Sequence, residues 1–159
     1  MKISEKQELL DKIRRLESDI YMLENQLISI APDDFEEIVR PWKLPPDFNP
    51  YRWSDEAAAK IIKKTMVVYP EGRAPCPLCN RHPDQHEGYA LPVGLERHLT
   101  GKLGYHQCYV FAAAQKRLTD DWNRDRREKH AATEDSRIKD ELKVRIKKLR
   151  ADPRLKGLT

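Results

Sequence analysis

The sequence predicts a mainly α-helical, elongated protein with an N-terminal coiled-coil-like helix, one small module rich in cysteine and histidine, and a long C-terminal helix. Three observations support this fold class. Of the 159 residues, 39% are apolar and 35% are charged, which leaves too little apolar material for one thick core. Apolar residues recur at helical spacing in both terminal regions. All three cysteines and four of the five histidines lie between residues 76 and 108.

The first segment, residues 1–31, is expected to form the coiled-coil-like helix. Its apolar residues alternate steps of four and three, which places them on one seam with the 3.5-residue repeat of supercoiled helices. Isoleucine at the a positions and leucine at the d positions over residues 13–23 favour a parallel pair, although the flanking charges are partly repulsive. We expect either a homodimer through residues 9–30 or packing of the seam on another helix of the same chain. The seam consists of Leu9, Ile13, Leu16, Ile20, Leu23, Leu27 and Ile30.

Residues 32–53 are expected to form a linker rich in proline and aromatic residues. Four prolines between residues 41 and 50 exclude regular helix or a central strand there. The aromatic side chains either pack along the neighbouring elements or form a docking strip for a partner, because aromatic anchors are enriched at interfaces. The candidate docking residues are Trp42, Tyr51 and Trp53. Residues 54–75 then predict a helix that is capped by Ser54 and ends near Met66, with a short strand as the lead-in to the next module.

The last segment, residues 109–159, is expected to be a basic helical region. No proline or glycine occurs between Gly104 and Pro153, and the segment carries 15 Lys and Arg against 9 Asp and Glu. Its later turns have the pattern of a basic amphipathic helix, and a basic surface favours a polyanionic partner. The alternative is a solvated helix face without a partner. The candidate phosphate-binding residues here are Lys143, Lys147 and Arg150.

The segment Cys76-Pro-Leu-Cys79 has the spacing of a metal knuckle, in which two thiolates face one tetrahedral ion from a tight turn. A redox pair would need a strand before it and a helix after it, and those flanks are missing here. Histidines follow instead, so residues 76–108 predict a metal-built module. Its odd number of cysteines in a chain without a secretion signal also argues against a disulfide framework.

Downstream of the knuckle, Tyr89, Leu95 and His98 stand at the spacing of the aromatic residue, the leucine and the first histidine of a two-Cys two-His zinc finger. The region resembles that family, and HLTGK with the later His106 is similar to the matrin-type variant. The resemblance implies one structural zinc per chain, held by Cys76, Cys79, His98 and His106. The loop before Tyr89 and the gap after His98 are both longer than in common fingers. Cys108 is therefore an alternative fourth ligand, and His82 and His86 could compete from the loop.

Fingers of this family often read DNA, and the resemblance implies that Leu91, Gly94 and Arg97 would face the bases. Only Arg97 can make a bidentate base contact. Little base-specific readout is therefore expected, and Arg97 and Lys102 join the candidate nucleic-acid-binding residues of this module.

These observations predict a non-enzymatic, zinc-binding accessory or regulatory protein that acts on nucleic acid or on a nucleic-acid-handling machine. The alternative is a protein-interaction adaptor or inhibitor that binds its partner through the finger and the aromatic linker. No catalytic residues are assigned, because no zinc-deaminase signature and no phosphate-binding loop occurs. The N-terminus lacks the apolar core of a secretion signal and no stretch approaches a membrane span, so we expect a cytoplasmic protein without a membrane partner, or a nuclear one in a eukaryote.

Overall fold

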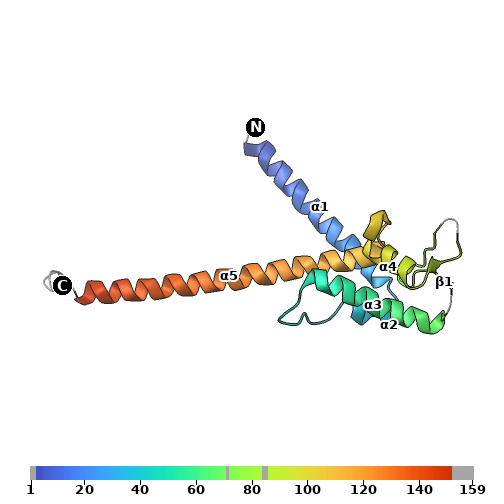
Figure 1. Cartoon of the computed structure of the whole chain (residues 1–159). Coiled ribbons are helices and arrows are strands. Elements are labelled where there is room, and N and C mark those ends of the chain that lie inside the picture. The colour runs from blue at the N-terminus through green and yellow to red at the C-terminus, as the bar shows by residue number, and fades with distance from the viewer. Residues whose placement is uncertain (1–2, 71, 84–85, 152–159) are drawn as a thin grey trace. The chain divides into compact units, whose positions relative to one another are not determined.

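The computed structural model describes residues 3–70, 72–83 and 86–151 and, within these ranges, the side chains of residues 5–149 (Figure 1). It confirms the predicted mainly α-helical fold. The chain divides into two units, Met1–Asp120 and Asp121–Thr159. The elements are α1 (Ile3–Ser29), α2 (Asp33–Val39), α3 (Pro50–Val68), β1 (Arg73–Ala74), β2 (Tyr89–Ala90), α4 (Val93–Thr100), the 3-10 turn η1 (Lys102–Gly104) and α5 (Tyr109–Ala151).

Helix α1 has the extent that its apolar repeat predicts, but the first unit leaves most of its seam uncovered. Every side chain from residue 5 to residue 23 is exposed. The last turns of the helix join the first unit, where Ile28 is buried and Leu27 packs against the core. Among the described residues of the first unit, no other helix covers the seam at residues 9–23.

Helix α3 begins four residues before the predicted cap Ser54. Pro50 occupies its first turn, where no intrahelical partner for a backbone N–H is needed. The Asn49 side chain accepts hydrogen bonds from the backbone N–H groups of Tyr51 at 2.9 Å and Arg52 at 3.4 Å. The helix also continues to Val68, so the expected strand lead-in is replaced by helix, and the short strand β1 comes later.

The core of the first unit lies where α2, α3, α4 and the first turns of α5 meet the end of α1. The ring of Trp53 stacks on that of Phe111 with centroids 5.2 Å apart and an interplanar angle of 17°. Strands β1 and β2 form a small antiparallel hairpin in which Ala74 pairs with Tyr89. The largest fully buried side chains include Phe111, Ile61, Leu95, Leu99, Val39 and Val110.

The described part of the second unit consists of the remaining turns of α5. Between residues 123 and 149 every side chain except that of Glu134 is exposed. The apolar residues of these turns, Ile138, Leu142, Val144, Ile146 and Leu149, are each about half exposed. None of the helices described is both long enough and apolar enough to span a membrane.

Candidate metal centre

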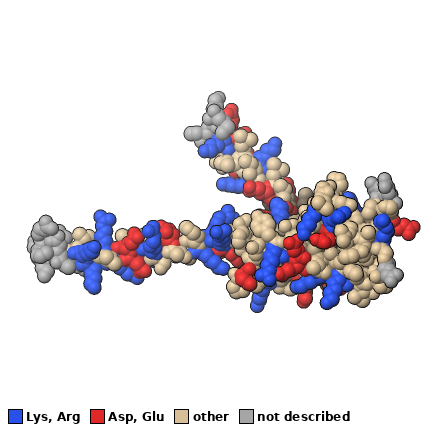
Figure 2. Space-filling model, in the orientation of Figure 1, with Lys and Arg blue, Asp and Glu red and all other residues tan. Residues whose placement is uncertain are grey.

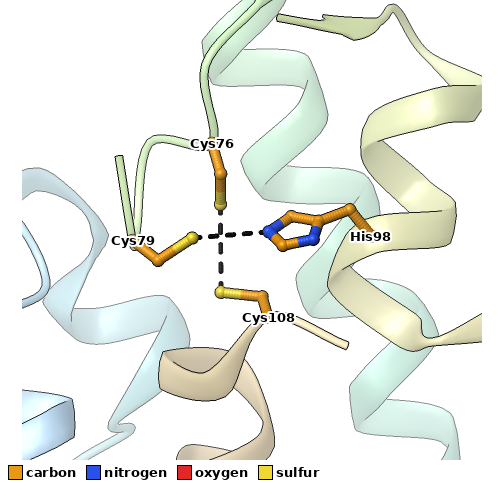
Figure 3. A group of neighbouring side chains, drawn as sticks. All are labelled: Cys76, Cys79, His98 and Cys108. Atoms are coloured by element: carbon orange, nitrogen blue, oxygen red, sulfur yellow. Dashed lines mark hydrogen bonds between the residues drawn. The ribbon is translucent and has the colours of Figure 1, made fainter. Parts of the chain in front are cut away.

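Four side chains converge on one point in the first unit: Cys76, Cys79, His98 and Cys108 (Figure 3). The two thiols of the knuckle come from the segment after β1, His98 comes from α4, and Cys108 directly precedes α5. All four are buried, and their ligand atoms lie within 4.8 Å of one another. The group could hold one metal ion.

The separations of the ligand atoms fit a tetrahedral site. The Sγ atoms of Cys76 and Cys108 are 3.9 Å apart, and Sγ of Cys79 lies 3.4 Å from Nε2 of His98. Zinc bonds of about 2.3 Å to sulfur and about 2.0 Å to nitrogen at the tetrahedral angle place two sulfurs about 3.8 Å apart, and sulfur and nitrogen about 3.5 Å apart. These two separations are close to those around one central zinc ion, and no two ligand atoms of the group are more than 4.8 Å apart.

The knuckle is built by backbone hydrogen bonds that turn the chain around Cys76. The N–H of Asn80 donates to the carbonyl of Cys76 at 2.8 Å, and the N–H of Cys76 donates to the carbonyl of Arg81 at 2.9 Å. The turn needs a left-handed residue, and Asn80, with φ of 53°, supplies it. The Arg81 guanidinium then lies over the ring of Tyr109, 5.0 Å from its centroid, which connects the knuckle to the start of α5.

His98 is held with Nε2 toward the thiols. Its Nδ1 lies 3.2 Å from the backbone carbonyl of His106. Because a carbonyl can only accept, Nδ1 must carry the proton, which leaves the lone pair of the neutral ring on Nε2. The imidazole also stacks on Tyr89 with ring centroids 4.2 Å apart. The tautomer and orientation are therefore those of a metal ligand.

Cys108 is brought to the site by the turn between α4 and α5. Helix α4 ends at Thr100, and the residue that caps it, Gly101, has a φ of 70°, which is left-handed and favours glycine. The chain returns so that the N–H of Cys108 donates to the carbonyl of His98 at 2.7 Å, while the carbonyl of Cys108 accepts from Ala112 at 2.8 Å. Cys108 thus precedes the first turn of α5, where the helix dipole favours a thiolate.

Because three sulfurs are buried close together, the pKa values of Cys76 and Cys79 shift in opposite directions. Hydrogen bonds from Cys108 and then Cys76 hold the pKa of Cys79 below its ordinary value. Hydrogen bonds with Cys108 and Cys79, together with burial, raise the pKa of Cys76. A single cation among the sulfurs would favour all three thiolates, since it compensates the charges that otherwise repel one another. Burial, followed by the charge on Cys79, raises the pKa of Tyr89 to about 12, so the stacked phenol stays neutral.

The expected fourth ligand, His106, is not part of the cluster, and Cys108 takes the place. The His106 side chain is exposed, and only its carbonyl reaches the site, through the hydrogen bond from His98. His82 and His86 are exposed as well. The difference arises because the turn after Gly101 points the backbone of residue 106, rather than its ring, at the site. A signal in the sequence was available: Cys108 lies directly before the apolar residues that start the buried face of α5.

The candidate nucleic-acid-binding residues are divided between the two units. In α4, the Arg97 guanidinium lies 5.7 Å from the ring centroid of Tyr105. Beyond α4, Lys102 pairs with Asp55 at 2.9 Å and with Glu96 at 3.2 Å. In the second unit, Lys143 pairs with Asp140 at 3.0 Å and Lys147 is exposed, while the side chain of Arg150 is outside the described part.

The three candidate docking residues are also divided. Trp42 and Tyr51 are 71% and 76% exposed, whereas Trp53 is half-buried in its stack with Phe111. Trp53 therefore belongs largely to the core, and the exposed aromatic surface of this segment is limited to the other two.

Comparison of the chain with protein-family models, with curated proteins and with solved structures found no match. The function proposed for the chain therefore rests on the geometry of the cluster and on the surfaces around it.

The hairpin beside the knuckle depends on Gly88. A Cβ atom built there would lie 2.6 Å from the carbonyl carbon of Ala74, inside the backbone of β1. Gly88→Ala is expected to separate the strands and lower the free energy of unfolding by about 1–3 kcal/mol, the usual cost of overpacking. The measurement is denaturant unfolding of the metal-loaded protein.

The matched control is Gly94→Ala, at the second residue of α4. A Cβ atom there meets the side chain of Ala90 at 3.3 Å, a contact that can relax, and alanine favours a helix. We expect this variant to change stability by less than about 1 kcal/mol. Equal effects of the two substitutions would contradict the assigned role of Gly88.

Proposed function

We propose that the chain is a non-enzymatic, zinc-stabilised accessory protein that acts on nucleic acid or on a nucleic-acid-handling machine. The observation that carries the proposal is the closed ligand set: four buried protein ligands would fill all four positions of a tetrahedral ion. A site with no position left for water or substrate is typical of structural zinc. Three thiolates and an imidazole also favour zinc over magnesium or calcium, which prefer oxygen ligands.

The role of the ion would be to hold the small elements of the first unit in place. It would join the knuckle, α4 and the residue that begins α5, three segments that share few backbone hydrogen bonds. Helix α3 packs against α4, so the position of the largest buried cluster depends on the site. The chain is highly charged and its core is small, so hydrophobic burial supplies little folding free energy. Metal binding would supply the additional folding free energy.

Helix α4 is poorly suited to base recognition. At the three positions that a DNA-reading finger would use, Leu91 is half-buried against the core, Gly94 has no side chain, and Arg97 lies over Tyr105. Lys102, close to the end of α4, is neutralised by two carboxylates. These contacts support a structural role for the module and little sequence-specific readout.

The C-terminal end of α5 is the better candidate for contact with phosphates. Residues 142–150 contain five Lys and Arg and no Asp or Glu. Figure 2 shows blue side chains along these last turns of the helix, next to the grey residues. Because phosphate contacts release counterions regardless of base sequence, such a cluster supports salt-dependent binding with little sequence preference. The five residues are Lys143, Arg145, Lys147, Lys148 and Arg150.

The test is binding of the full-length, zinc-loaded protein to labelled duplex DNA, single-stranded DNA and RNA between about 50 and 200 mM salt. We expect affinity to fall steeply as salt rises, and the double variant Lys143→Glu, Lys147→Glu to lower the slope of log affinity against log salt by about 2. The control is Lys60→Glu, Lys63→Glu on α3, which makes the same change of charge at exposed positions. Absence of binding to any of the three nucleic acids at the lowest salt would contradict the proposal.

A protein-interaction adaptor is the second candidate, and two observations favour it. Trp42 and Tyr51 are far more exposed than large aromatic residues usually are. Nearby, α2, the linker and α3 enclose an open groove of about 700 Å³ whose lining includes Phe48, Trp53 and Lys60. If nucleic-acid binding is absent at low salt, this surface becomes the better basis for function.

A further inference from the structure

The exposed part of α1, which we call the free arm and define as residues 6–23, carries an apolar seam that no other described segment of the first unit covers. Its five seam residues are between 49% and 58% exposed: Leu9, Ile13, Leu16, Ile20 and Leu23. An isolated helix of this length is marginal in water, and an aliphatic seam along it is stabilised only by burial against another apolar surface. The seam is purely aliphatic, so a second copy of the same seam complements it.

At the end of the free arm and beyond it, α1 already contacts α5 of its own chain. Glu24 pairs with Lys116 of α5 at 2.6 Å, and the ring of Tyr21 lies 3.9 Å from the Arg117 guanidinium. Leu27, the next seam position, packs against the core. A partner helix therefore has access to the free arm but not to the end of α1.

This occupation disfavours a parallel pair. In a parallel dimer the partner helix would continue past Glu24, where α5 already lies beside the seam. Heptad positions also put Asp19 next to Glu24 of the partner subunit, a repulsive pair, although Lys12 would meet Glu17 attractively.

An antiparallel pair avoids both problems in one register. Pairing Ile13 with Leu16 of the partner subunit also pairs Leu9 with Ile20 of the partner subunit. Each of these two pairings occurs twice in the symmetric dimer. The flanking residue Lys12 then lies beside Asp19 of the partner subunit, again twice, and the partner helix ends near Glu24 instead of passing it.

The neighbouring antiparallel register is unfavourable. Sliding the helices by one heptad places Glu17 against Glu17 of the partner subunit and Asp19 against Asp19 of the partner subunit. It also requires Leu27 to pair with Leu9 of the partner subunit, but Leu27 already packs against the core of its own chain. The flanking charges and the accessible part of the seam therefore favour the same register, in which Ile13 pairs with Leu16 of the partner subunit.

We propose that the protein forms a symmetric dimer in which the free arms of two copies pair antiparallel, with Ile13 against Leu16 and Lys12 against Asp19 of the partner subunit. The dimer does not depend on nucleic-acid binding. It doubles the chain's metal-centred unit and brings two copies of every other surface into one particle.

The first test is the oligomeric state of the full-length, zinc-loaded protein by sedimentation equilibrium. A dimer is expected, and Leu16→Lys should convert it to a monomer because it places a charge in two core layers. Met22→Lys is the matched control: Met22 is 56% exposed on α1 but lies off the seam, so this variant should remain a dimer. Circular dichroism and zinc content establish that both variants are folded. A monomeric unaltered protein would overturn the proposal.

The second test separates the two orientations. Asp19→Lys places one lysine beside each Lys12 in the antiparallel pair, which creates two repulsive contacts and should weaken dimerisation roughly 4- to 30-fold. The double variant Lys12→Asp, Asp19→Lys restores opposite charges and should recover the affinity. In a parallel pair, Asp19→Lys would instead face Glu24 and strengthen the dimer. Tighter dimerisation of that variant would therefore overturn the antiparallel arrangement.

Discussion

Replacement of Cys108 by serine is expected to abolish tight zinc binding and to unfold the metal module. A neutral hydroxyl cannot replace the thiolate that completes the four-ligand set, and it leaves the other three buried ligands without an ion. Loss of a direct ligand should weaken zinc by more than the roughly 10- to 100-fold that is typical when only an outer partner is lost. The measurement is zinc per chain after dialysis under reducing conditions, combined with thermal unfolding.

His106→Ala is the matched control, because it removes the side chain that the zinc-finger resemblance implied as the ligand. The variant keeps the backbone carbonyl that accepts from His98, so it should retain one zinc per chain and nearly unchanged stability. If His106→Ala lost zinc and Cys108→Ser kept it, the Cys76, Cys79, His98, Cys108 site would be incorrect.

Phe111→Ala should produce the largest loss of stability outside the metal ligands, about 3–5 kcal/mol. The side chain is fully buried at the first turns of α5, and its ring stacks on Trp53, so truncation leaves a cavity between α3 and α5. Urea unfolding followed by tryptophan fluorescence measures the effect, since Trp53 itself loses its neighbour.

Trp42→Ala provides the comparison for that measurement. It deletes an even larger aromatic side chain, but from a position that is 71% exposed, and should change the free energy of unfolding by less than about 0.5 kcal/mol. A loss of several kcal/mol on this substitution would show that Trp42 is buried in solution, which contradicts its exposure in the structure.

Three of the four candidate metal ligands were predictable from the sequence, and the reason is local geometry. Two cysteines separated by two residues define a knuckle by themselves, and His98 follows an aromatic residue and a leucine at finger spacing. The fourth ligand could not be chosen from the spacing of the residues, because spacing alone admits both His106 and Cys108. The choice depends on the left-handed turn at Gly101 and on the hydrogen bond from the Cys108 N–H to His98, neither of which spacing encodes.

The helices, too, were predictable from the sequence only in part. The repeat from Leu9 onward predicted α1 well, because 3.5-residue spacing over several turns is a strong signal. The start of α3 was misplaced, because Pro50 was interpreted as a helix breaker, whereas a proline in the first turn of a helix is favourable. Which seam residues remain uncovered could not be predicted, since that depends on contacts such as Glu24 with Lys116, between residues far apart in the chain.

The four candidate ligands also have a consequence for the entropy of folding. Cys76 and Cys108 are 32 positions apart, and Cys79 and His98 are 19 positions apart, so one ion bound to all four would close a large loop nested within another. In the chain-entropy model, closing a loop of that size costs about 3–4 kcal/mol of conformational entropy, which the binding energy of the ion would offset. Loop-closure entropy grows only logarithmically with length, so doubling the segment between Cys79 and His98 would cost only about 0.6 kcal/mol more. The enlarged loop that distinguishes this chain from common fingers therefore adds little to the free-energy cost of loop closure.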